Sequence, residues 1–202
     1  MSRPVISRFT LFFIAVFMLA CEGNAGDEET GKSYDEKGIV VDFDTDFQIT
    51  IPQYFQEMYD INPKADLQYG FINKEKDSAS ADFEDEVYVT ILMLPKSELA
   101  PTFSDSGRIT LSRVNDRTAI NLELILDDFT IGNPSPSPTL INGLPAIRND
   151  FSGRLGQYRV AYKMGLYETE TDFYQLLTWC MEKHKSKHNS EMDAMINSIE
   201  KK

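Results

Sequence analysis

The chain has 202 residues, and its 32 Asp and Glu side chains against 20 Lys and Arg give a formal net charge of −12 at pH 7. This acidity excludes a general nucleic-acid binder, because such proteins need a basic face that neutralises phosphates. It also disfavours attachment to anionic lipid head groups by charge alone.

The first 20 residues have the architecture of a secretory signal peptide. Arg3 and Arg8 precede an apolar core of 12 residues, Phe9 to Ala20. A membrane-spanning helix needs about 20 apolar residues, so this core is too short to be one and is typical of a cleaved signal. Cleavage after Ala20 would leave 18 basic and 32 acidic side chains, a net charge of −14.

The end of this segment, Met18-Leu19-Ala20-Cys21, resembles the lipobox of bacterial lipoproteins. The resemblance implies cleavage between Ala20 and Cys21 and a diacylglycerol thioether on Cys21, usually with a third, amide-linked chain. Two or three acyl chains anchor a protein stably, since each buried methylene contributes roughly 0.8 kcal/mol. An ordinary signal peptide with an incidental cysteine is the alternative. We favour lipidation and a place in the bacterial envelope, in the outer membrane facing the periplasm or the cell surface.

Residues 21–46 are expected to form an acidic, flexible tether behind the lipidated Cys21. They are rich in Gly and acidic residues and poor in large apolar groups, a composition that favours disorder. Asp27-Glu28-Glu29 resembles an acidic cluster that routes some lipoproteins to the cell surface, although a solvated spacer explains it equally well. Three alternating acids, Asp42, Asp44 and Asp46, fail as an EF-hand calcium loop, because the required Gly and Glu positions hold Phe47 and Gln53.

Residues 47–202 are expected to form one globular domain that begins with strands. Phe47 to Pro52 and Leu67 to Ile72 alternate between apolar and other side chains. The run from Val87 to Leu94 is apolar on both faces, which predicts a central strand covered on both sides. The acidic residues 77–86 predict a long hairpin loop before it.

A helix is expected from Gly107 to Phe129, because apolar residues fall on one face of this segment. These residues are Leu111, Val114, Leu122, Ile125, Leu126 and Phe129. The following segment, 133–138, contains three prolines and is expected to be a stiff spacer that is neither helix nor central strand.

The last third predicts an antiparallel meander over 145–153, 158–166 and 172–182. A closing helix is expected from Asn189 or Ser190, where Ser190 and Asp193 approximate a capping box. Its apolar stripe predicts a helix packed on the sheet, with Lys201 and Lys202 dispensable behind it. The stripe consists of Met192, Met195, Ile196 and Ile199.

This order of elements resembles the PsbP-like superfamily, which includes an extrinsic photosystem subunit and many exported bacterial lipoproteins. The matching segments are Phe47 to Pro52, Asn142 to Ile147, and the terminal strand and helix up to Ile199. The resemblance implies an α+β fold, an antiparallel sheet of about six strands with helices packed on both faces. Relatives serve mostly as non-catalytic binding or assembly modules, and a fold alone does not define function.

Sequence motifs for catalysis, cofactors or metals are missing: there is no Gly-rich phosphate loop, HExxH, CxxC or GxSxG. His184 and His188 have the i, i+4 spacing of a metal pair, but Lys183, Lys185 and Lys187 surround them, so an exposed connection is the favoured interpretation. Cys180 is expected to be a small buried hydrophobe. We assign no catalytic residue, metal ligand or cofactor, and treat the adjacent acids Asp127 and Asp128 as coincidental.

The leading functional hypothesis is a lipid-anchored, non-catalytic envelope protein that binds a protein partner or supports assembly. A second hypothesis is a carrier of a small apolar ligand or lipid, and a hydrolase ranks last. The carrier hypothesis depends on aromatic residues that could line a pocket: Tyr54, Phe55, Tyr59, Tyr69 and Phe71.

Overall fold

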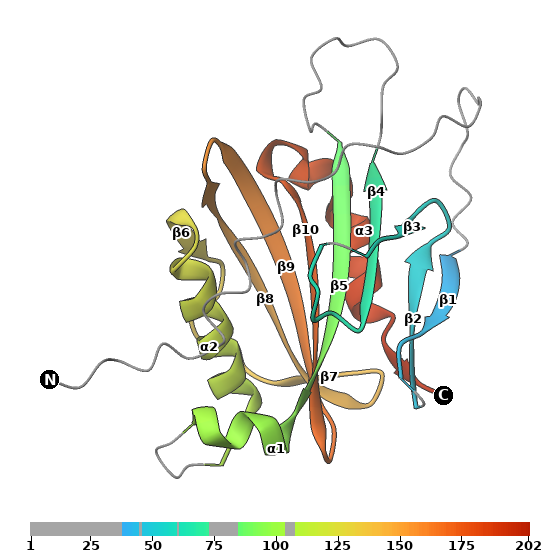
Figure 1. Ribbon diagram of the computed structural model, residues 1–202, viewed down its shortest axis with the longest axis vertical. Coiled ribbons are helices and arrows are strands. Elements are labelled where there is room, and N and C mark those ends of the chain that lie inside the picture. Colours follow the sequence, from blue (N-terminus) through green and yellow to red (C-terminus); the bar gives the residue numbers. More distant parts are fainter. Residues whose placement is uncertain (1–37, 45, 60, 73–84, 104–107) are drawn as a thin grey trace, which may run out of the picture.

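The computed structural model describes residues 38–44, 46–59, 61–72, 85–103 and 108–202 (Figure 1). The expected signal peptide, Cys21 and residues 22–37 of the expected tether therefore lie outside the described residues. Within the described part, no helix is long and apolar enough to cross a membrane.

The main sheet has eight strands, and every pairing in it is antiparallel. Seven form a continuous order, β3-β4-β5-β10-β9-β8-β6, and β7 pairs with β8 beside them. The meander predicted from the last third is confirmed as β8, β9 and β10. The strands are β3 (Gln56–Glu57), β4 (Leu67–Ile72), β5 (Glu86–Pro95), β6 (Asp127–Ile131), β7 (Thr139–Ile141), β8 (Leu144–Leu155), β9 (Tyr158–Glu168) and β10 (Asp172–Met181).

A second, three-stranded sheet has the order β1-β2-β11, formed by Gly38–Asp42, Phe47–Pro52 and Glu200–Lys201. It corrects the C-terminal boundary of the expected tether, because β1 lies inside residues 21–46. Five residues of β1 pair with β2, and Val41 packs against the core, so this short segment gains hydrogen bonds and apolar burial together. Lys201 also pairs with Phe47, so the chain end is part of the structure.

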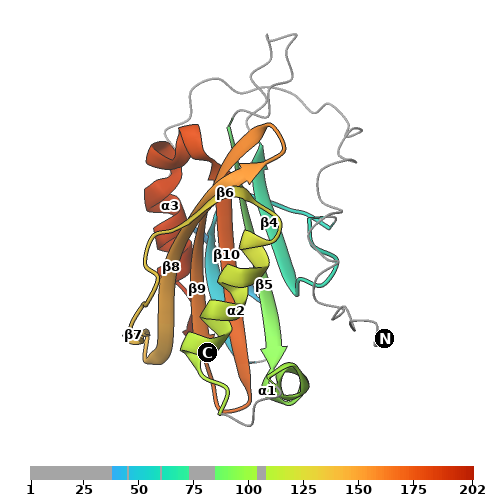
Figure 2. The same cartoon turned by 90° about the vertical axis from the view of Figure 1, so that its left-hand side faces the viewer.

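Helices cover both faces of the main sheet, as the PsbP-like resemblance implies. Figure 2 shows α2 (Leu111–Glu123) on one side of the sheet and α3 (Lys185–Asn197) on the other. Short helical segments α1 (Lys96–Leu99), η1 (Ala100–Thr102) and η2 (Glu182–His184) precede them. The fold is therefore an α+β sandwich, with eight strands in its main sheet rather than the six expected overall.

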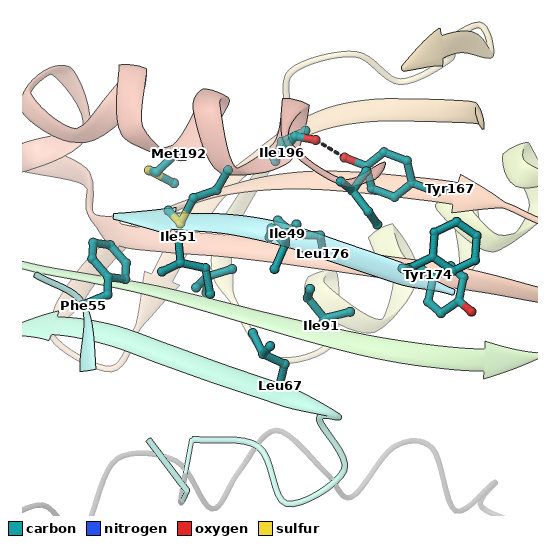
Figure 3. Packing of buried hydrophobic residues seen from close by; sticks show 14 of the residues in the cluster. Ile49, Ile51, Phe55, Leu67, Ile91, Tyr167, Tyr174, Leu176, Met192 and Ile196 are labelled. Atoms are coloured by element: carbon teal, nitrogen blue, oxygen red, sulfur yellow. Dashed lines mark hydrogen bonds between the residues drawn. The ribbon is translucent and has the colours of Figure 1, made fainter. Parts of the chain in front are cut away.

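Two hydrophobic cores follow from this arrangement. One lies between the main sheet, α3 and β2, and contains Ile49, Ile51, Leu176 and Met192. Figure 3 shows these side chains meeting between the strands and the helix, where the Tyr167 hydroxyl donates to the backbone carbonyl of Ile196. The other core lies beneath α2. Together the two cores bury β10 on both faces, so both of its alternating side-chain sets are inside the protein.

Helix α2 is shorter than expected at both ends. It begins after Thr110, whose hydroxyl accepts a hydrogen bond from the Arg113 amide, and it ends at Glu123. The predicted C-terminal residues instead form β6, where Phe129 stacks on Phe151 of β8 with ring centroids 6.0 Å apart. Apolar residues at helical spacing cannot distinguish one long helix from a helix followed by a half-buried strand.

Helix α3 begins at Lys185, earlier than the expected start at Asn189 or Ser190. Its N-terminal turns include His188, which is buried, so the expectation that this histidine lies in an exposed connection is wrong.

The C-terminal end of α3 is held by the hairpin between β7 and β8. The Asn142 side chain donates 2.8 Å hydrogen bonds to the carbonyls of Asn197 and Ile199. Asn142 and Gly143 both have positive φ, as a tight hairpin turn between β7 and β8 requires.

The buried stripe of α3 should control the stability of the domain. Ile196 is 1% exposed, so Ile196→Ala is expected to lower the free energy of unfolding by about 2–5 kcal/mol. Ile120→Ala is the matched control, since Ile120 lies on α2 and is 48% exposed. Urea denaturation measures both variants. Equal midpoints for Ile196→Ala and the unsubstituted chain would mean that α3 does not pack on the sheet.

Candidate functional site

An apolar pocket of about 100 Å³ lies between α2, β5, β10 and the segment that carries α1 and η1. Its wall is formed mainly by aliphatic and aromatic side chains, with a few polar groups from α2, β10 and the chain near Asn62. The lining residues are Asn62, Lys64, Leu92, Leu94, Leu99, Phe103, Val114, Arg117, Thr118, Asn121, Leu122, Gln175 and Leu177.

Strand and helix periodicity bring these residues to one place. Leu92 and Leu94 are two positions apart on β5, so both point to the α2 face of the sheet. Gln175 pairs directly with Leu92 across the β5–β10 ladder. On α2, Arg117 and Asn121 are four residues apart and therefore lie on one side of the helix.

The floor of the pocket is held by a short hydrogen-bond chain. Gln175 Nε2 donates to Thr118 Oγ1 at 2.7 Å and approaches Met164 Sδ at 3.6 Å. Thr118 Oγ1 in turn donates to the carbonyl of Val114 at 3.1 Å. These contacts fix the spacing between α2 and β10, so the pocket is part of the packed fold.

A separate polar cluster joins the start of α3 to the start of β5. The His188 side chain is 2% exposed, and its Nε2 lies 2.6 Å from Asp85 Oδ1 while its Nδ1 lies 3.0 Å from Glu191 Oε2. Tyr54 donates to the other oxygen of Glu191 at 2.5 Å, and Lys187 pairs with Asp85. One imidazole is therefore held between two carboxylates.

This geometry favours the protonated form of the His188 ring. Burial lowers the pKa of His188, but the hydrogen bonds to Glu191 and Asp85 and the charges of these two carboxylates outweigh it, so the pKa is raised. Burial likewise raises the pKa of Glu191, yet the hydrogen bonds from His188 and Tyr54 lower it overall. With both ring nitrogens bonded to carboxylates, His188 has no free nitrogen to act as a base or to bind a metal.

The other two reactive groups weighed in the sequence are Cys180 and His184. Cys180 is buried, as expected, with its Sγ 3.8 Å from Met192 Sδ, and burial raises the pKa of its thiol to about 11. A protonated thiol is a poor nucleophile. Burial lowers the pKa of His184, whose Nε2 has no hydrogen-bond partner in the described part of the chain.

The acidic residues considered as sites lie in ion pairs and hydrogen bonds at the surface. Asp127 and Asp128 pair with Arg154 at 3.4 and 3.3 Å. Asp44 accepts a hydrogen bond from Tyr174, and Asp42 pairs with Lys202 at 3.0 Å. Among the described residues, no group of three or more His, Cys, Asp or Glu side chains could hold a metal ion.

The aromatic residues proposed as a ligand site do not line the pocket. Phe55 is buried in the core beneath α3, where Tyr54 and Phe71 pack against it, and Tyr59 is 72% exposed. The pocket lies on the opposite face of the sheet. The sequence contains one indication of this site. Residues 87–94 are apolar on both faces, so the α2 face of β5 must also be covered by other elements.

The charge of His188 should make the stability of the domain depend on pH. A raised folded-state pKa contributes stability that is complete below the unfolded value of about 6.5 and is lost as the pH rises through the folded pKa. His188→Gln is expected to cost about 1.5–3 kcal/mol at pH 6, as for hydrogen bonds to charged groups, and less at pH 9. Urea denaturation at the two pH values measures the difference.

His184→Gln is the control for this experiment. The pKa of His184 is lowered, so the stability cost of this substitution should not shrink as the pH rises. A cost of His188→Gln that is the same at pH 6 and pH 9 would mean that His188 is not held as a cation.

Comparisons with known proteins identify the fold. No protein-family model and no curated protein matches the sequence. Cyanobacterial PsbP from Synechocystis sp. PCC 6803 is similar in structure, with a TM-score of 0.51 at 13% identity over 85% of this chain and 96% of that one.

Two further structures show a weaker likeness. LpqN of Mycobacterium tuberculosis, described as involved in cell envelope biogenesis, has a TM-score of 0.49 at 11% identity over 84% of this chain and 87% of that one. A protein of unknown function from Pseudomonas aeruginosa has a TM-score of 0.45 at 13% identity, over 80% of this chain and 94% of that one. From the cyanobacterial match and the arrangement of its strands and helices, the chain has a PsbP-like fold.

Proposed function

We propose that the chain is a lipid-anchored, non-catalytic protein of the bacterial cell envelope whose folded part is a binding module. The observation that carries this proposal is the state of its reactive side chains. Both ring nitrogens of His188 bond to carboxylates and Cys180 is a buried thiol. The described residues that line the apolar pocket include no His, Cys, Asp or Glu. A pocket of this kind suits binding rather than bond cleavage.

The expected anchor fits the position of the first strand. The described structure begins with β1 at Gly38, which leaves residues 22–37 between Cys21 and the domain. The tether expected from the sequence would span roughly 20–24 Å over these residues, as a Gly-rich chain of about 16 residues does. Acyl chains on Cys21 would therefore hold the domain close to the membrane while it binds a protein partner of the envelope.

The pocket favours a second candidate, a carrier of a small apolar ligand. The two functions are compatible, since a lipid-anchored domain can hold a ligand near the membrane from which the ligand comes. They differ in what fills the binding site: a protein surface in the first, and a small molecule beneath α2 in the second.

Membrane fractionation tests the anchor. Cys21→Ser removes the sulfur that the lipobox resemblance assigns to the diacylglycerol, so the protein is expected to leave the membrane fraction or to stay unprocessed. Cys180→Ala is the matched control, because it removes the other cysteine and should leave the protein in the membrane. Mass spectrometry of the N-terminal peptide measures the acyl chains. A wild-type protein without acyl mass, retained equally after Cys21→Ser, would contradict the proposal.

A further inference from the structure

We propose that the pocket beneath α2 binds a free fatty acid, with the alkyl chain between α2 and the sheet and the carboxylate held by Arg117 and Asn121. The inference rests on the proposed role as a non-catalytic binding module and assigns that role a ligand class. It places the site on the α2 face, away from the aromatic residues that the sequence suggested.

The interior of the pocket suits an alkyl chain. Leu94 and Leu99 line it from the strand and α1 side, and Val114, Leu122 and Leu177 line it from α2 and β10. An engineered apolar cavity of about 150 Å³ holds a benzene molecule, so about 100 Å³ has room for roughly four carbon atoms. The rest of a longer chain would extend through the open side.

The polar groups of the pocket favour an anion. Arg117 is half-buried and forms no ion pair within the described part of the chain, and Asn121 makes no side-chain hydrogen bond there. Lys64 adds a second positive charge to the lining. Among the described residues that line the pocket, none is acidic.

The shape of these donors favours a carboxylate. A guanidinium presents a planar pair of N–H groups that matches the two oxygens of a carboxylate. Asn121, one helical turn further along α2, supplies another N–H donor on the same side of the helix. A neutral alcohol would interact only weakly with the positive charge of Arg117, and an alkylammonium ion would be repelled by it.

Photo-crosslinking in intact membranes tests the inference with the full chain. The probe is octanoate carrying a diazirine in its alkyl chain, compared with the same chain ending in an alcohol and with a diacyl phospholipid carrying the same diazirine. Octanoate is expected to label peptides of α2, β5 or β10, and unlabelled octanoate should compete. The alcohol controls for labelling that comes only from the surrounding membrane.

Two variants separate ligand binding from folding. Arg117→Gln should reduce labelling by about tenfold, as expected for the loss of one charge-assisted contact, with an unchanged urea midpoint. Arg154→Gln is the matched control, because Arg154 pairs with Asp127 and Asp128 at the surface and does not line the pocket. Labelling of this control should equal that of the wild type.

Three outcomes would overturn the inference: no labelling of these elements, equal labelling by the alcohol, or labelling only by the phospholipid. Undiminished labelling of Arg117→Gln would do the same. Each of these leaves the acyl mass on Cys21 unaffected, so failure of the ligand inference is distinguishable from failure of the proposed anchor.

Discussion

The apolar side chains of β10 point to both faces of the main sheet, so both faces must be shielded from water. This requirement explains how the other elements are arranged. Leu176 and Cys180 point to the core beneath α3, whereas Leu177 and Trp179 point to the core beneath α2. Apolar burial is worth about 25 cal/mol per Å², so a sheet uncovered on either side would lose much of its stability. The small sheet β1-β2-β11 and α3 cover one face, and α2 covers the other.

The two covers are attached in different ways. On the α3 side, charged groups add to apolar packing: the buried Lys163 lies 2.7 Å from Asp193, which Arg148 also contacts, and His188 bridges Asp85 and Glu191. On the α2 side, packing against β5 and β10 is incomplete and leaves the pocket. Buried or half-buried ion pairs therefore help to hold α3 on the sheet, whereas the packing beneath α2 leaves a pocket.

The sequence predicted correctly those elements whose apolar pattern lies within one short segment. The alternation of β9 and β10 and the apolar stripe from Met192 to Ile199 were read correctly. The strand β6 was missed because Phe129 also fits a helical stripe, and β1 was missed because acidic neighbours surround its five residues. The His188–Asp85 contact joins residues 103 positions apart and therefore leaves no pattern in any one stretch of sequence. The pocket joins five separate segments, so the two-sided apolar character of residues 87–94 predicts a cover on each face of the strand but not the pocket itself.

In the described part of the chain, an apolar pocket beneath α2 has Arg117 and Lys64 among its lining residues. This pocket supports the proposal that the folded part is a binding module. A crystal structure of the chain grown with octanoate would test this account most directly. It should show the carboxylate within hydrogen-bond distance of Arg117 and the alkyl chain against Leu94 and Leu177. A pocket closed by protein side chains, with octanoate absent or bound elsewhere, would contradict the account.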